Sequence, residues 1–310
     1  MKKIAYIGLF LGLSMVGGCT EESLDRRRQE GVVQIALSWE QGHVPAGARL
    51  YFYPESGDAM FSRDCPAEGF SGALPVGRYR VIVTNDGWGD VAMRNESRYD
   101  KAEFYVLPET AESTGSVAAA FGRAGGTFVC QPPYMASAVR FVESETLDVP
   151  FRETVRVSAA PRSHVKHVRF AFKVENFPAL TSLRGSFSGV SPSVCLSSRV
   201  CSPVSAGVRF AAAPVGDGSS EWTSDISVFD LVSPVEAALT HLLIMDLTDG
   251  SGVVRQAVVD LTASVAEILS ESEDGVLPAE IRLNIAFTFL DGSLRASVLF
   301  WEEGSGAGVL

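Results

Sequence analysis

The segment 281–300 alternates apolar and polar side chains on both sides of an Asp-Gly pair, and no other feature constrains the fold as strongly. Asp291-Gly292 is the strongest short signal for a β-hairpin. A two-residue loop there would pair apolar residues with apolar residues: Phe289 with Leu294, Phe287 with Ala296, Ile285 with Val298 and Leu283 with Phe300. A slip by one residue would turn polar groups into the core, so we expect a well specified register.

Strand patterns of this kind recur along the chain, and turn residues bound them. They cover 32–39, 49–53, 78–84, 103–107, 154–157 and 165–174. Helical spacing is found in 261–270, and no alternation of strands with helices indicates a parallel-sheet enzyme fold. We therefore predict an all-β protein with two antiparallel β-sandwich domains in series and one short helix near 261–270. The Ala-, Gly- and Ser-rich stretch 110–126 is left unassigned.

The first 18 residues have the layout of a secretory signal. Lys2 and Lys3 precede the short apolar stretch 4–16, and Gly17-Gly18 stands directly before Cys19. A Cys after small residues resembles the lipobox of bacterial lipoproteins, which implies cleavage before Cys19 and lipid attachment to its thiol. Several acyl chains make membrane attachment stable where one would not. The alternative is an ordinary signal peptide with an incidental Cys.

Residues 19–30 are polar, lack apolar periodicity and are interpreted as a tether. Thr20-Glu21-Glu22 resembles the surface-export signal of Bacteroidetes lipoproteins, so the expected location is the outer membrane, lipid-anchored and exposed at the cell surface. Arg26-Arg27-Arg28 is interpreted as solvated, and a trypsin-like processing site is the alternative. The predicted domains are then 31–149 and 150–310, with the boundary at Pro150.

The charge of the chain argues against nucleic acid as a partner. With 26 basic and 37 acidic residues the formal net charge is −11. A net acidic chain gains no counterion release from a phosphate backbone. With 46% hydrophobic and 20% charged residues, the composition is that of a globular protein and not of a disordered chain.

No catalytic, metal or cofactor motif was found, and we predict that the protein is not an enzyme. His164 and His167 lie at i and i+3 of a strand pattern, which places them on opposite faces and favours surface histidines over metal ligands. The stretch 85–90 (Asn-Asp-Gly-Trp-Gly-Asp) suits a turn with a packed Trp better than a calcium or sugar site. Asp246 and Asp249 are interpreted as hairpin residues first and as cation ligands second.

Three sequence blocks carry a resemblance to a known family. They are Gly47–Pro54, Leu74–Val81 and the region from Val174 to Gly189. They are similar to blocks of a Bacteroidales surface lipoprotein family of unassigned function, which is related to fimbrillin-like and minor-fimbria anchor subunits. The resemblance implies two transthyretin-like β-sandwich domains, and it carries over no catalytic residue.

Four cysteines remain after Cys19, and four cysteines allow three pairings. Export makes disulfides chemically permissible. The simplest choice by domain pairs Cys65 with Cys130 and Cys195 with Cys201. Buried free thiols are the alternative.

Two classes of function fit these observations. The first is a lipid-anchored surface protein that acts by binding, as a fimbrial anchor or accessory subunit or an adhesin, with fimbrial subunits bound by strand addition. The second is a glycan-binding surface lipoprotein of a nutrient-uptake system. An open sheet edge would favour the first class, and exposed aromatic rings around one groove would favour the second.

Overall fold

The structure, a computed structural model, describes residues 29–40, 42–109, 127–237, 239–272 and 277–303. The predicted signal segment, Cys19 and the predicted tether as far as residue 28 lie outside these residues, as does 110–126. Within the described part, no helix has the length and apolar character needed to span a bilayer.

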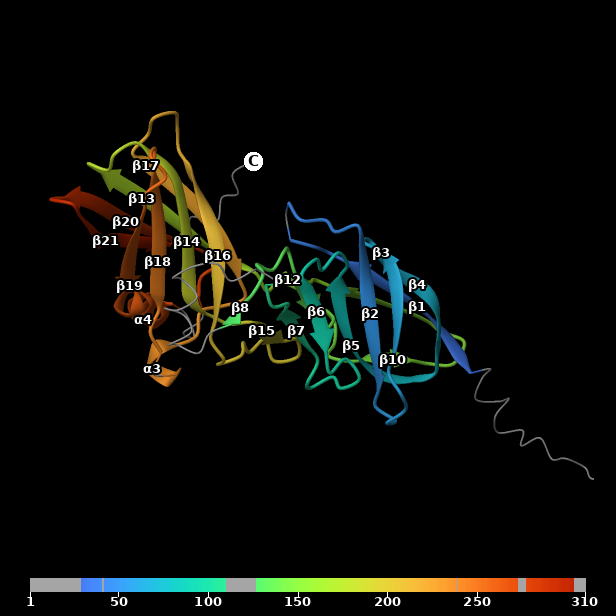
Figure 1. The fold of residues 1–310 in the computed structure, drawn as a ribbon. Coiled ribbons are helices and arrows are strands. Elements are labelled where there is room, and N and C mark those ends of the chain that lie inside the picture. The colour runs from blue at the N-terminus through green and yellow to red at the C-terminus, as the bar shows by residue number, and fades with distance from the viewer. Residues whose placement is uncertain (1–28, 41, 110–126, 238, 273–276, 304–310) are drawn as a thin grey trace, which may run out of the picture.

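The N-terminal lobe is built from two sheets (Figure 1). The first has the strand order β11-β1-β4, and the second has the order β12-β9-β5-β2-β3, with β10 pairing to β5. The first sheet comprises β1 (Glu30–Leu37), β4 (Gly69–Pro75) and β11 (Thr154–Ala159). The second comprises β2 (Gly47–Pro54), β3 (Phe61–Pro66), β5 (Gly77–Asn85), β9 (Ala136–Ala138), β10 (Leu147–Val149) and β12 (Arg162–Ser163).

The C-terminal lobe is one large sheet with the order β19-β18-β14-β16-β17-β13-β20-β21, to which β8 adds through β16. Its strands are β8 (Thr127–Phe128), β13 (Lys166–Glu175), β14 (Leu180–Val190), β16 (Ala206–Pro214), β17 (Glu221–Val228), β18 (Leu242–Asp249), β19 (Val254–Asp260), β20 (Glu280–Leu290) and β21 (Ser293–Glu303). The helices are α3 (Pro234–Ala237) and α4 (Thr262–Glu271). The sheet curls so far that its end strands β19 and β21 lie side by side.

The all-β prediction is confirmed, and α4 matches the predicted helix to within one residue. The sheets are mixed, however, and not purely antiparallel. Strands β1 and β11, β13 and β20, and β8 and β16 pair in parallel. Alternation within one strand shows which residues face the core, but it does not reveal the direction of the neighbouring strand.

Two hydrophobic cores share the β2–β5 sheet. Leu50 and Phe52 of β2 point to the core between the two N-terminal sheets. Tyr51 and Tyr53, the alternate residues of the same strand, point to a second core that continues into the C-terminal lobe. Because both faces of β2 are covered, most of this strand is buried. The larger core is dominated by alternating residues of β13 and β20, such as Phe170 and Ile285.

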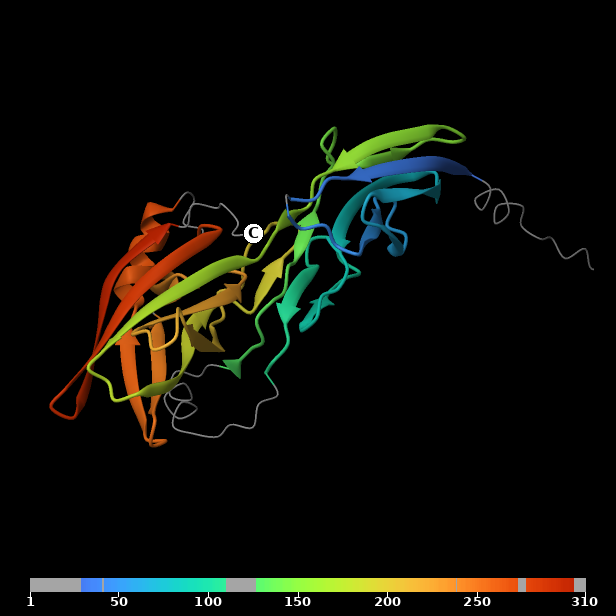
Figure 2. The ribbon, with the colours of Figure 1, turned by 90° about the horizontal axis from the view of Figure 1, so that it is seen from above.

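A small third sheet joins the two halves of the chain. Strand β15 (Ser193–Cys195) pairs with β7 (Glu103–Val106), which pairs with β6 (Val91–Arg94). The predicted division of the chain at residue 150 stays a prediction. Strands β11 and β12 follow that residue but pair with β1 and β9, so these pairings favour a border after Ser163. Figure 2 shows the N-terminal and C-terminal lobes side by side, with this junction between them.

Gln131 lies where the C-terminal sheet opens beside the junction. Strands β16 and β17 pair only at Ala213 and Pro214 among the described residues. Farther along, the Gln131 carboxamide bridges them: its Nε2 donates to the Arg209 carbonyl at 3.0 Å, and its Oε1 accepts from the Ser227 amide at 3.0 Å. The side chain thus takes the place of a peptide group between two separated strands.

The predicted hairpin forms, with one change of register. Leu290 pairs with Ser293, Phe287 with Ala296 and Ile285 with Val298, as expected. A bulge between Asn284 and Ile285 then shifts the partner of Leu283 from Phe300 to Trp301. Phe300 is left 55% exposed, because the extra residue turns it away from the core.

Candidate functional site

The four histidines do not form a metal site. His164 is buried and its Nε2 lies 2.7 Å from the Ser137 hydroxyl, so the prediction of a surface histidine is wrong at this position. His167 is half-exposed, as predicted, and pairs with Asp225 at 3.2 Å. The described residues contain no group of three or more His, Cys, Asp or Glu side chains placed to hold a metal ion.

We expect His164 to make folding sensitive to acid. Burial, with the nearby charges of Arg199 and Lys166, lowers the pKa of His164 to about 3. The folded state therefore favours the neutral ring, so this stabilisation is complete above pH 6.5 and declines as the pH falls toward 3. At 1.36 kcal/mol per pKa unit, the free energy of unfolding should fall by about 2 kcal/mol between pH 7 and pH 5 from this group.

Urea unfolding of the wild type and of His164→Gln at both pH values checks this expectation. Glutamine keeps a polar group near Ser137 but does not titrate, so the variant should lose less stability on acidification. Equal losses in the two proteins would show that His164 does not supply the pH dependence.

The 85–90 loop is a packed turn, as the sequence predicts. The Asn85 side chain is buried, donates to the Asp86 and Tyr134 carbonyls and accepts from the Ala136 amide. The Trp88 indole donates to the Asn85 carbonyl, and its ring packs edge-on against Phe104 at 5.2 Å. The carboxamide and the indole are therefore used within the fold.

The Asp249 loop is also structural. One Asp249 carboxylate oxygen accepts from the Ser251 amide, the Ser251 hydroxyl and the Val253 amide, which closes the β18–β19 hairpin. Asp246 accepts from Gln256 on the neighbouring strand. The interpretation as hairpin residues is the one the geometry supports.

The structure holds Cys65, Cys130, Cys195 and Cys201 as free thiols. Cys65 packs against the N-terminal core and Cys130 against the larger core, so the fold does not bring this pair together. Cys201 is paired opposite Val194, and successive residues of a strand point to opposite faces. A Cys195–Cys201 bridge therefore requires one thiol to turn, and it stays a prediction. Cys19 lies outside the described residues.

The two neighbouring thiols should differ in reactivity. Burial acts to raise the pKa of Cys195, but hydrogen bonds from Ser197 and Ser198 outweigh it and leave this pKa below its usual value. Burial raises the pKa of Cys201 to about 12. Because the thiolate is the nucleophile, iodoacetamide should label Cys195 of the reduced protein at least about tenfold faster at neutral pH.

Timed labelling with peptide mass spectrometry measures both rates, and Ser197→Ala should slow the labelling of Cys195. Equal rates for the two thiols would contradict the difference in environment. Material mapped without reductant shows whether the predicted bridge forms, since bridged thiols take up no label.

One end strand of the C-terminal sheet has an edge without a β-ladder. Strand β21 pairs with β20, and no described strand forms a ladder with its other edge, beside which the end strand β19 lies. Leu299 and Phe300 of this strand are more than half exposed. A long exposed apolar edge strand is a template for pairing with another chain. The neighbouring end strand β19 has the same character, with Val254 and Val258 exposed.

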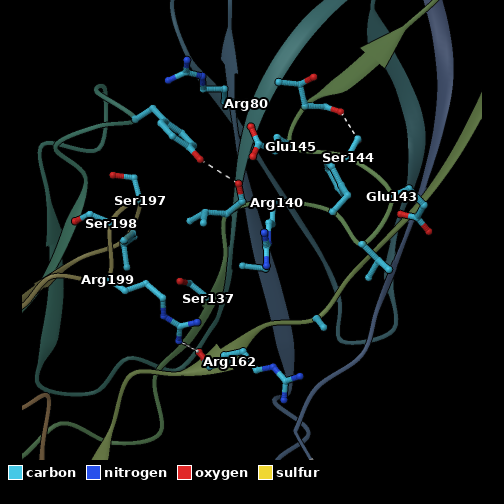
Figure 3. A pocket seen from close by; sticks show the side chains of 18 of the residues that line it. Arg80, Ser137, Arg140, Glu143, Ser144, Glu145, Arg162, Ser197, Ser198 and Arg199 are labelled. Carbon is cyan, nitrogen blue, oxygen red and sulfur yellow. Dashed lines mark hydrogen bonds between the residues drawn. The ribbon is translucent and has the colours of Figure 1, made fainter. Parts of the chain in front are cut away.

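A groove of about 1130 Å³ lies at the junction of the two lobes (Figure 3). Its walls come from the β9–β10 loop, the start of β5 and the loop after β15. Charged side chains dominate it: the arginines Arg78, Arg80, Arg140, Arg162 and Arg199 and the glutamates Glu55, Glu143 and Glu145. The sequence did not indicate this site, because its residues are scattered between positions 55 and 199 and form no motif.

Most of these charges are engaged within the groove wall. Arg78 and Arg80 approach Glu55 at 3.5 and 3.8 Å. The Glu143 carboxylate accepts from the amide and the hydroxyl of Ser158, and these bonds lower its pKa. Arg199 donates to the Arg162 and Ser163 carbonyls of β12. Arg140 has no side-chain hydrogen bond or ion pair with any residue that the structure describes.

Comparison with solved structures supports the all-β fold of the chain. A crystal structure named "putative adhesin" from Bacteroides ovatus has a TM-score of 0.59 and 21% identity, over 86% of this chain and 93% of that one. Another, named "putative polysaccharide binding proteins (DUF1812)", from Bacteroides thetaiotaomicron, has a TM-score of 0.53 and 11% identity, over 89% and 99%. At these identities the likeness shows the fold.

The sequence comparisons are more specific. Residues 18–211 match the model of the domain of unknown function DUF5119, and the chain belongs to this family. It is 24% identical over 305 residues to the protein named "Putative fimbrium anchoring subunit Fim4B" of Bacteroides ovatus, which covers 91% of this chain and 86% of that protein. The predicted resemblance to surface proteins related to fimbrial anchor subunits is confirmed.

Proposed function

We propose that this protein is a lipid-anchored subunit of the cell surface that holds a fimbria by binding and not by catalysis. The observation that carries the proposal is the edge of β21 that forms no ladder, with its exposed Leu299 and Phe300. An extended segment of a fimbrial subunit would add to this edge, with main-chain hydrogen bonds giving affinity and side-chain contacts giving specificity. The fimbrium-anchoring name of the Bacteroides ovatus relative supports this assignment.

The N-terminal sequence supports the proposed attachment to the membrane. Cys19 would carry the lipid, and the polar stretch 19–30 would give slack between the outer membrane and the folded chain. The fold fits this order, because β1 begins at Glu30, the last residue of the proposed tether.

The test of the edge uses a gene-deletion strain that carries variants on a plasmid. Leu299→Lys combined with Phe300→Lys places charges on the exposed edge and blocks strand pairing. Fibres should then be shed into the medium, whereas Val44→Lys, at a 76% exposed apolar position of the N-terminal lobe, should retain them. Full retention by the double variant would rule out the β21 edge as the attachment site.

The test of the anchor is Cys19→Ala with a palmitate analogue. The variant should take up no label and should leave the membrane fraction. If label and membrane association persist, the lipid assignment is wrong. If the deletion leaves fibres normal and crosslinking recovers only a nutrient transporter, the glycan-uptake alternative replaces the fimbrial one.

A further inference from the structure

We propose that the groove at the junction of the lobes, defined by its lining residues Arg140, Arg199, Ser197 and Ser198, binds a carboxylate-bearing saccharide. The site is distinct from the β21 edge and does not depend on the function proposed above.

The groove lining contains more basic than acidic residues, whereas the whole chain contains more acidic than basic residues. The sequence carries a net charge of −11, yet five arginines and three glutamates line the groove. Glu55 is paired with Arg78 and Arg80, Glu143 bonds the uncharged Ser158, and Glu145 is the third glutamate of the lining. Arg140 remains without a bond to the described residues, and Figure 3 shows Arg140 and Arg199 reaching into the same space from different loops. A guanidinium fork of this kind matches the geometry of a carboxylate.

Arg199 is held in place for such a role. Its guanidinium donates at 3.3 and 3.0 Å to two successive carbonyls of β12. Partial burial lowers its pKa, since removal from water disfavours its charge. An anion next to it would restore that lost solvation. The fixed Arg199 and the unpaired Arg140 therefore form two sides of an anion site.

The remaining wall favours a sugar over a peptide. The hydroxyl groups of Ser144, Thr146, Ser197 and Ser198 border the groove. Each makes one contact within the fold, which leaves each able to form a further hydrogen bond with a sugar hydroxyl. A peptide held by strand addition needs a free strand edge. Here β9 is paired on both sides, and the two β12 carbonyls are occupied by Arg199.

The aromatic content of the groove excludes recognition of a neutral sugar by stacking. Its ring systems are Tyr99 and Phe141, and Phe141 is buried. Arg80 covers the Tyr99 ring at 5.2 Å, and Tyr53 packs edge-on against it at 5.5 Å. Recognition then depends on charge, which points to an acidic sugar such as a uronate or a sialate.

Calorimetric titration of the full chain tests the proposal with matched pairs of probes. The pairs are a galacturonate trimer with its methyl ester, and 3′-sialyllactose with lactose; a polyglutamate peptide is the third arm. We expect one acidic sugar to bind and its neutral partner not to bind, and the two pairs distinguish uronate from sialate. Added salt should weaken the binding.

The decisive variant is Arg140→Gln, since Arg140 is exposed and makes no bond that the fold needs. It should weaken binding by at least about tenfold, as expected for the loss of one charge-assisted contact. Arg63→Gln, on β3 outside the groove, should bind as the wild type does. Leu299→Lys with Phe300→Lys should also leave sugar binding unchanged, which separates this site from the fimbrial edge.

Three results would overturn the proposal. They are no heat with either acidic sugar, equal binding of acid and ester, and wild-type affinity in Arg140→Gln. Binding of the peptide alone would assign the groove to an acidic protein segment instead.

Discussion

Replacing Gly189 by alanine should destabilise the protein by about 3–5 kcal/mol, the sum of backbone strain and a broken buried hydrogen bond. Gly189 lies in the β14 bulge with a φ of 85°, in the left-handed region. An added Cβ would overlap the imidazole of His241. That ring is fully buried, and its two nitrogens lie 3.3 Å from the Ser188 carbonyl and 2.9 Å from the Val232 carbonyl. A neutral imidazole donates to one of them, and the ring cannot move without losing that hydrogen bond.

Gly292→Ala is the matched control for this variant. Gly292 has nearly the same φ, 80°, but a Cβ there meets no atom within 4 Å. Gly292→Ala should lower the free energy of unfolding only by the strain of the backbone, about 1 kcal/mol. Urea unfolding of both variants at neutral pH measures the difference, and a similar shift of both midpoints would show that His241 yields readily.

Removing the Asp230 carboxylate should cost about 3–5 kcal/mol, because it leaves a nearly buried ammonium without its partner. Lys166 Nζ lies 2.9 Å from the Asp230 carboxylate, and the two side chains are only 16% and 13% exposed. The other carboxylate oxygen accepts from the Leu231 and Leu277 amides. Asp230→Ala therefore breaks an ion pair and two backbone contacts together.

An exposed pair serves as the comparison. Arg49 and Asp64 approach at 2.5 Å, but their side chains are 45% and 72% exposed. Asp64→Ala should change the free energy of unfolding by less than about 1 kcal/mol, because solvent screens the pair. The double variant Lys166→Met with Asp230→Ala should recover part of the loss. If Asp230→Ala lowers the free energy of unfolding by no more than Asp64→Ala does, the Lys166–Asp230 pair does not stabilise the fold as its burial implies.

The two strands of the C-terminal hairpin were predicted correctly because their two faces differ strongly in polarity. The hairpin register was correct from Leu290 back to Ile285, because every pair up to that point places apolar side chains on one face. It failed at the Asn284 bulge, since a bulge inserts a residue without changing the composition of the strand. Strand β14 was missed for a related reason: Ser186 and Ser188, on the face opposite Phe187, are buried but polar.

The groove and the buried His164 could not be predicted from the sequence. His164 stands beside Lys166 and His167, so its neighbours in sequence suggest a surface position. Its burial results from contacts with Ser137 and Phe104, which come from other parts of the chain. Arg140 and Arg199 are likewise 59 residues apart in sequence, and their shared space is created only by the junction of the lobes.

The way in which Gln131 closes the gap between β16 and β17 has a mechanical consequence. A protein fixed to a membrane at its N-terminus and to a fibre through β21 would carry tension across the junction of its lobes. There the chain crosses more than once: β8 and Gln131 enter the C-terminal sheet, while β15 returns to pair with β7. Separating the lobes would require the hydrogen bonds of several strand pairs to break at the same time rather than one pair after another. Since forced unfolding is governed by the unfolding rate, interleaved strands of this kind favour a slow response to load.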